Sequence, residues 1–180
     1  MKAAPLASAQ IRSALWMTAG ARVHAVIDGS IVPGLPARLR QARCVGWDCL
    51  QRGALTPAAA ESAAYIVELK PEAEFTTWLL GEACTALAGW GVLMSSPKPL
   101  LAMREHSRRL VEVQGPDGRR RTWRWWDAEL LAELLPRLAP SQLDTFFAPG
   151  QHVVSPGPQR WTWWQRRDGQ LHTQVRERVA

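Results

Sequence analysis

Hydrophobic positions along this 180-residue chain fall into short continuous runs separated by stretches with helical spacing. In the helical stretches, apolar side chains recur every three or four positions, as in amphipathic helices. The continuous runs are rich in β-branched residues or bounded by turn residues, which is typical of buried strands. The strand-like runs are residues 23–29, 44–50, 63–69 and 90–95, and the helix-like stretches are residues 33–43, 73–87 and 98–110.

The next part of the chain predicts a β-hairpin that leads into a helix. Residues 110–126 contain a strand, a Gly-Pro-Asp-Gly turn at 115–118 and a second strand rich in arginine and tryptophan. Asp127 follows at once and is suited to cap a leucine-rich helix. Residues 141–147 add a short helix or turn.

Three short strands are expected at the C-terminus, over residues 151–155, 160–167 and 171–178. The last two are joined by Asp168-Gly169, a typical hairpin turn. We therefore predict an α/β fold: a mixed β-sheet with flanking helices, a β-hairpin and a C-terminal β-meander. We expect three parts, namely an N-terminal arm or short helix at 1–20, an α/β domain at 21–149 and a Trp-rich β extension at 150–180.

Composition limits the class of protein. The apolar fraction of 47% is that of a globular protein. The chain shows no signal-peptide pattern and no run of about 20 apolar residues, so we expect a cytoplasmic protein without a membrane span. The net charge of +6 comes from 22 basic against 16 acidic residues. Such an excess favours acidic partners or nucleic acid, and it also arises in GC-rich genomes without selection for binding.

The sequence contains no recognised catalytic or metal-binding motif. It lacks a Gly-rich phosphate loop, a GxSxG nucleophile elbow and an HExxH helix. Cys44 and Cys49 with His24 match no common zinc spacing, and a hydrolase built from His24, Asp28 and Asp48 has no motif behind it. We therefore expect no metal, no cofactor and no enzymatic activity.

Arginine and tryptophan are concentrated in two segments, and these residue types are enriched where proteins bind other macromolecules. In the first segment, alternation along a strand would place Trp123 and Trp125 on one face and Arg124 and Trp126 on the other. In the second segment, Trp161 and Trp163 would share a face opposite Trp164. The two strands would either form a stacking platform for single-stranded nucleic acid or pack against each other and a helix, with arginines on the rings.

The same residues carry a resemblance to a known family. The order of the strand at 23–29, the strand at 63–69, a helix with a central Trp78 and the strand at 90–95 resembles the adaptor-chaperone domain of type VI secretion. These Tap or TEC adaptors, long listed as a domain of unknown function, load toxic effectors onto the VgrG spike. The resemblance covers roughly residues 22 to 149. The family's motif positions are occupied here by Arg124, Trp125, Trp126, Asp127, Phe146 and Phe147.

Two departures from the family pattern affect what the resemblance implies. Ala128 stands where the family usually has proline, and the helical second lobe of many relatives has no counterpart after the Phe-Phe-Ala-Pro segment. The resemblance implies a cytoplasmic adaptor that binds a secreted effector and VgrG. We expect Arg124 and Asp127 to form a structural ion pair. Partner contacts are expected at Trp161, Trp163 and Trp164, and a nucleic-acid-binding domain is the alternative.

Overall fold

The computed structural model describes residues 8–114, 117–148, 150 and 152–178. Its main element is a seven-stranded sheet in the order β2-β3-β1-β4-β7-β8-β9, in which every pairing is antiparallel. The strands are β1 (Arg22–Asp28), β2 (Gly46–Cys49), β3 (Ala64–Leu69), β4 (Gly91–Ser96), β7 (His152–Ser155), β8 (Arg160–Arg167) and β9 (Gln170–Glu177).

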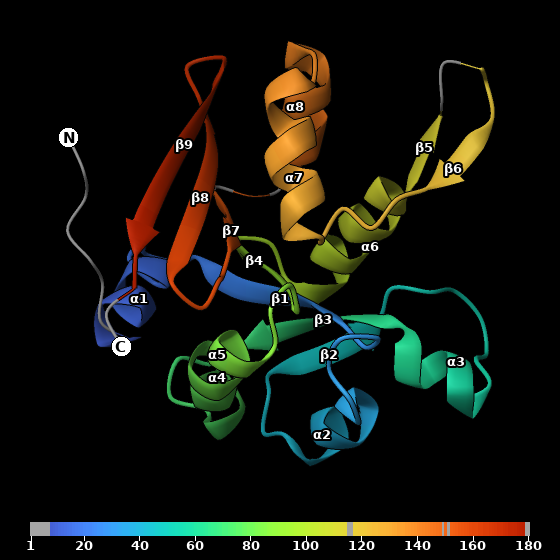
Figure 1. Ribbon diagram of the computed structural model, residues 1–180, viewed down its shortest axis with the longest axis vertical. Coiled ribbons are helices and arrows are strands. Elements are labelled where there is room, and N and C mark those ends of the chain that lie inside the picture. Colours follow the sequence, from blue (N-terminus) through green and yellow to red (C-terminus); the bar gives the residue numbers. More distant parts are fainter. Residues whose placement is uncertain (1–7, 115–116, 149, 151, 179–180) are drawn as a thin grey trace.

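Helices cover both faces of the sheet, as Figure 1 shows. On one side lie α1 (Ser8–Leu15), α2 (Leu35–Gln41), α4 (Glu74–Trp78), a π-helical turn (Leu79–Ala83) and α5 (Cys84–Ala86). On the other side lie α6 (Leu100–Val111), α7 (Ala128–Leu134), a 3-10 turn (Leu135–Arg137) and α8 (Pro140–Phe147). A further short helix, α3 (Pro57–Ser62), precedes β3 and buries no side chain.

The two faces form two hydrophobic cores, because alternate residues of a strand point to opposite sides. In β1, Ala25 and Ile27 belong to the first core, on the α1/α2/α4 side. Val26 between them belongs to the second core, on the α6/α7/α8 side. β3 is buried along its whole length, which confirms the prediction of a buried strand at 63–69 and shows that the strand is covered on both faces.

The expected α/β class, with flanking helices, a hairpin and a C-terminal meander, is confirmed, although the sheet is antiparallel in every pairing and not mixed. β7 pairs with β4, so the meander β7-β8-β9 continues the same sheet. Within the described residues, no helix is long and apolar enough to cross a membrane.

The hairpin departs from the prediction in one respect. β5 (Glu112–Gln114) and β6 (Arg120–Thr122) pair as a separate two-stranded sheet, and β6 ends before the tryptophans. The predicted strand through Trp126 is therefore wrong in its second half. Trp125 and Trp126 both enter the second core, which a strand's alternation would forbid. The Gly115 and Pro116 of the predicted turn lie outside the described residues.

Candidate functional site

The Arg-Trp-Trp-Asp segment, residues 124–127, folds as a turn over the end of β1. The backbone N–H of Asp127 donates to the carbonyl of Arg124, with an N···O distance of 2.9 Å. Trp125 is fully buried, and its indole N–H donates to the carbonyl of Ser107 in α6 at 3.1 Å. Its ring meets Phe146 edge-on, with 5.8 Å between centroids. These contacts connect the segment to both α6 and α8.

Asp28, the last residue of β1, is the polar anchor of this turn. Its side chain is 4% exposed. Its Oδ2 accepts from the indole N–H of Trp126 at 2.8 Å and from the guanidinium of Arg124. Its Oδ1 accepts from the backbone N–H of Ser30 at 2.9 Å and from the Ser30 hydroxyl. Burial by itself raises the pKa of Asp28, but the Ser30 and Trp126 hydrogen bonds and the Arg124 charge outweigh it and hold the pKa below its ordinary value.

Gly29 allows a second chain segment to approach this anchor. Its backbone N–H donates to the carbonyl of Ala63 at 2.9 Å, and a Cβ at this position would lie 2.4 Å from that oxygen. Only glycine tolerates so close an approach of two backbones. The junction between α3 and β3 is thereby placed beside Asp28.

A cleft of about 610 Å³ lies between this junction and the α6–β6 region. Ser30, Ser62 and Thr122 contribute hydroxyls, and none of the residues that line it is a histidine or a cysteine. The remaining lining combines an apolar surface with three arginines, the acidic residues Asp28 and Glu112, and Gln51. The apolar residues are Leu50, Leu55, Ala64, Val111 and Trp126, and the arginines are Arg52, Arg108 and Arg124.

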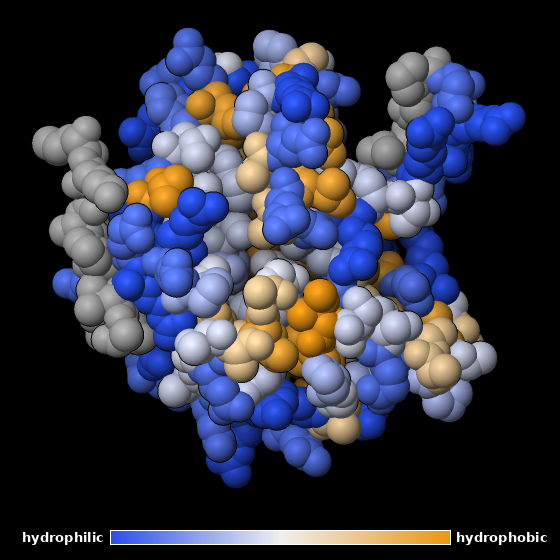
Figure 2. Space-filling model, viewed as in Figure 1, coloured by the Kyte–Doolittle hydropathy of each residue, from blue (hydrophilic) through white to orange (hydrophobic). Residues whose placement is uncertain are grey.

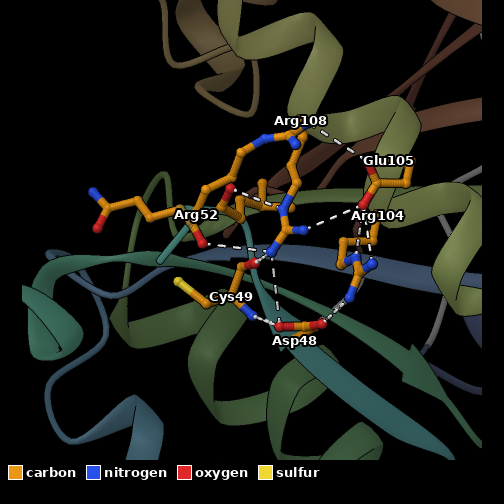
Figure 3. Close-up of polar contacts among 8 residues, drawn as sticks. Asp48, Cys49, Arg52, Arg104, Glu105 and Arg108 are labelled. Carbon is orange, nitrogen blue, oxygen red and sulfur yellow. Dashed lines mark hydrogen bonds and ion pairs between the residues drawn. The ribbon is translucent and has the colours of Figure 1, made fainter. Parts of the chain in front are cut away.

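Arg108 of α6 fixes the cleft wall formed by residues 49–51 (Figure 3). Its Nη2 donates to the carbonyl of Cys49 at 2.7 Å, and its Nε donates to the carbonyl of Leu50 at 3.1 Å. Glu105, one turn earlier on α6, pairs with its Nη1 at 3.2 Å. The side chain is only 13% exposed, so its donors hold the wall and are not available to a ligand.

The other two arginines of the cleft remain accessible. The Arg52 side chain is 71% exposed and pairs with Glu105 at 3.5 Å, and the Arg124 side chain is 49% exposed. An apolar surface bordered by two accessible guanidinium groups is suited to bind a chain segment that carries both apolar and acidic side chains.

The expected ion pair between Arg124 and Asp127 is wrong. Arg124 pairs with Asp28, which is 96 positions away in the sequence. The Asp127 Oδ1 accepts from the backbone N–H groups of Glu129 at 2.9 Å and of Leu130 at 3.2 Å. Asp127 is therefore the N-cap of α7, as its position predicted, and its carboxylate serves the helix.

Trp161, Trp163 and Trp164 are the residues at which partner contacts are expected, and their burial contradicts this expectation. Trp161, Trp163 and Trp164 are 1%, 7% and 2% exposed. Trp161 and Trp163 stack in the first core with 5.7 Å between ring centroids, and Trp164 lies in the second core. Because helices cover both faces of β8, none of the three rings is accessible to a partner or to a nucleic-acid base.

Phe146 and Phe147 are core residues at the end of α8. They are 4% and 5% exposed, and their ring centroids lie 5.1 Å apart. The Phe146 carbonyl lies 2.9 Å from Nε2 of His106, which must donate because a carbonyl only accepts. Burial lowers the pKa of His106 and favours its neutral form.

The side chains considered for zinc or hydrolytic chemistry have separate surroundings. His24 is fully buried beside Glu68, with 3.7 Å between Nε2 and Oε2, and Asp48 pairs with Arg104. Burial raises the pKa of Cys44 to about 11 and also raises that of Cys49, so both thiols are protonated at neutral pH. Over the described ranges, no group of three or more His, Cys, Asp or Glu side chains is placed to hold a metal ion.

The arginines of the hairpin lie at the surface. Arg120 pairs with Glu112 at 3.5 Å, and Arg121 pairs with Asp117 at 3.0 Å. Figure 2 shows hydrophilic residues over the described part of this hairpin, at the upper right of the view. Surface pairs of this kind contribute little to stability.

Sequence reasoning identified Arg124 and Trp126 through the family motif but gave no role to Arg108. Its neighbours Arg104 and Arg109 have a similar local context, so nothing in the sequence distinguished it. The sequence suggested Asp28 as a member of a hydrolase site that no motif supports.

The family described as "Domain of unknown function (DUF4123)" matches residues 23–145. Neither the comparison with curated proteins nor the comparison with solved structures finds a match.

Proposed function

The chain belongs to the DUF4123 family, and on that premise we propose that it is a non-enzymatic cytoplasmic adaptor that binds a type VI secretion effector and the VgrG spike protein. The proposal is supported by the resemblance of its strand order and its Arg-Trp-Trp-Asp segment to the Tap or TEC adaptors. The observation that carries it is that the matched region contains both Asp28 and the Arg124–Trp126 turn, whose contacts shape the cleft.

The cleft is the surface that we assign to a partner. A larger groove of about 1300 Å³ lies along α2 and α4, but there Arg38 already stacks on Trp78, 3.9 Å from the ring centroid. In the smaller cleft, Arg52 and Arg124 keep accessible charge beside an apolar floor. An apolar side chain of the partner would bind to this apolar surface, and the two guanidinium groups would orient an acidic side chain next to it.

In this mechanism the adaptor binds the effector and thereby stabilises the bound form, and no covalent bond is made or broken. A chaperone that binds a partly folded effector segment lowers the free energy of the bound form by mass action. An effector that is bound by the adaptor and the spike together is held near the spike by effective concentration. No cofactor or nucleotide takes part.

The test is co-expression of this chain with a candidate effector and a candidate VgrG from the same genome, followed by size-exclusion chromatography and calorimetry. We expect a complex that Arg52→Glu weakens by at least tenfold, because the substitution reverses a charge at the cleft. Arg137→Glu is the matched control. Arg137 is 70% exposed, pairs with Glu133 and lies outside the cleft.

Each outcome bears on the proposal. A chain that binds neither an effector nor VgrG would contradict the adaptor function, and equal losses in the two arginine variants would move the binding surface away from the cleft. Binding to single-stranded DNA whose affinity falls steeply with salt would favour the nucleic-acid alternative.

A further inference from the structure

The strand β9 ends the sheet, and its outer edge has no partner strand among the described residues. It pairs with β8 over its whole length, from Gln170 opposite Arg167 to Glu177 opposite Arg160. An edge of eight residues without proline is long for a protein that must avoid unwanted pairing. The edge is therefore a candidate template for an added strand.

The alternation of hydrogen bonds between β8 and β9 shows which backbone groups of β9 point away from β8. The N–H of Arg178 donates to the carbonyl of Gln159, the residue that precedes the Arg160–Glu177 pair. In an antiparallel pair, hydrogen-bonded and non-hydrogen-bonded positions alternate. The even-numbered residues of β9 therefore face β8. The residues whose N–H and C=O point outward are Leu171, Thr173, Val175 and Glu177.

The two faces beside this edge differ in chemistry. On the first-core side, a groove of about 390 Å³ lies between α1 and the meander, and it is lined by Arg167, His172 and Arg176 among others. None of the residues that line it is acidic. On the opposite side, Leu171 packs at the margin of the second core and Val175 is 47% exposed.

The arginines of the groove are held in place by neutral partners. Arg176 donates to the side chain of Gln174 at 2.8 Å and lies over the ring of Trp163, 4.9 Å from its centroid. Arg167 donates to the side chain of Gln165 at 3.3 Å. Neither arginine forms an ion pair in the described part of the chain, so both keep an uncompensated charge that an acidic ligand would neutralise.

We propose that the outer edge of β9 binds an extended, acidic segment of a partner protein as an added strand. Its alternate carboxylates would meet Arg167 and Arg176 over the groove, and the side chains between them would pack as apolar residues beside Leu171 and Val175. The period of two follows from strand geometry, and the charge follows from the lack of acidic residues in the groove. This inference rests on β9 and its neighbours, and it holds whether or not the cleft at Asp28 binds an effector.

The test uses a labelled eight-residue peptide that alternates Glu and Val, measured by fluorescence anisotropy with the full chain. Two control peptides separate charge from pattern: one has Lys in place of Glu, and one has the same Glu and Val residues in two blocks. We expect the alternating acidic peptide to bind at least about tenfold more tightly than either control.

Variants at one position separate the backbone from the side chain. Thr173→Pro removes an outward N–H, and proline is tolerated at an edge position that does not donate to the neighbouring strand. It should weaken peptide binding by about tenfold or more. Thr173→Ala keeps the N–H, so its affinity for the peptide should stay within about twofold of that of the unmodified chain. Arg176→Gln should lower the affinity for the peptide and make that affinity less dependent on salt. Thermal melting verifies that each variant is folded.

Several results would overturn the proposal. One is that the alternating acidic peptide fails to bind, and another is that the block or Lys peptide binds as tightly as it does. A third is that the Thr173→Pro variant is folded and still binds the peptide with unchanged affinity. A dimer of the unmodified chain that Thr173→Pro converts to a monomer would show that a second copy occupies the edge. Arg52→Glu should leave peptide binding at β9 unchanged, which keeps failure here distinct from failure of the adaptor function.

Discussion

Two tryptophan-rich segments of this chain, residues 123–126 and 161–164, differ in sequence at one position but adopt different structures. The first reads Trp-Arg-Trp-Trp and the second reads Trp-Thr-Trp-Trp. The second is a regular part of β8, with its rings divided between the two cores. The first is an irregular turn that sends both Trp125 and Trp126 into the second core.

The difference lies in where the indole N–H groups find acceptors. In the first segment, Trp123, Trp125 and Trp126 donate to the carbonyl of Leu110, the carbonyl of Ser107 and the carboxylate of Asp28. In the second segment, the buried Nε1 of Trp161 has no hydrogen-bond partner among the described residues. β7 and β9 bond to the backbone of β8 on both sides and preserve the strand.

The comparison shows that two similar segments are stabilised in different ways. Side-chain hydrogen bonds and the Arg124–Asp28 ion pair hold the Arg-Trp-Trp-Asp turn in one conformation, as the wall of a binding cleft requires. Packing and ladder hydrogen bonds fix β8, which suits a core strand. Variants that separate polar from apolar contributions should therefore affect the two segments differently.

The largest effect is expected from Asp28→Ala. This change leaves the Trp126 indole without its buried acceptor and Arg124 without its counter-charge, so the free energy of unfolding should fall by about 3 kcal/mol in urea titrations. Asp48→Ala is the matched control, because that carboxylate also pairs with an arginine but is 35% exposed. A control loss as large as that of Asp28→Ala would show that burial does not set the strength of the anchor.

Lowering the pH should weaken the seven-stranded sheet, which contains the second segment and against which the first segment packs. Burial outweighs the attraction of Glu68 and lowers the pKa of His24 from 6.5 to about 4. The unfolded chain takes up a proton near pH 6.5 and native His24 does not until about pH 4, so stability should fall as the pH decreases through that window.

At pH 5, His24 should make the free energy of unfolding about 2 kcal/mol lower than at pH 7.5. This pH lies above 3.8, the ordinary pKa of an aspartate such as Asp28, so the Arg124–Asp28 pair stays intact and the sheet is tested separately. The measurement is urea denaturation at both pH values. His24→Gln should flatten the dependence, and an unchanged slope in that variant would assign the effect to other groups.

A direct comparison of the two segments comes from replacing one tryptophan in each by phenylalanine. Trp125→Phe and Trp161→Phe both shrink a fully buried ring, so their packing losses should be similar. Trp125→Phe also removes the hydrogen bond to Ser107, whereas Trp161→Phe removes an N–H that has no described partner. Trp125→Phe should therefore cost about 1 kcal/mol more. Equal losses would show that packing alone holds both segments.

Much of the fold could be predicted from local patterns. The β-branched runs at 23–29 and 63–69 became the inner strands β1 and β3, because a sheet covered on both faces requires continuous apolar runs. The cap at Asp127 and the turn at Asp168-Gly169 followed from residues whose conformational preferences are strong.

The candidate site could not be predicted in the same way, because it depends on contacts between distant segments. The partner of Arg124 lies 96 positions away, and the nearer carboxylate at Asp127 was the natural choice on local grounds. The burial of Trp161 depends on helices far away in the sequence, which cover both faces of β8. Strand periodicity correctly separated Trp164 from the other two rings but gave no information about what covers each face.

The smallest effect is expected at the end of the Arg-Trp-Trp-Asp turn, where Asp127 acts through α7 alone. Asp127→Ala removes two hydrogen bonds to the first turn of the helix and should lower the free energy of unfolding by about 1 kcal/mol, with a lower melting temperature. Asp127→Asn keeps a capping oxygen and should recover most of that loss. If Asp127→Ala left stability unchanged and abolished effector binding, the Asp127 carboxylate would belong to a contact surface. The turn would then bind the partner directly, and its role would not be limited to shaping the cleft.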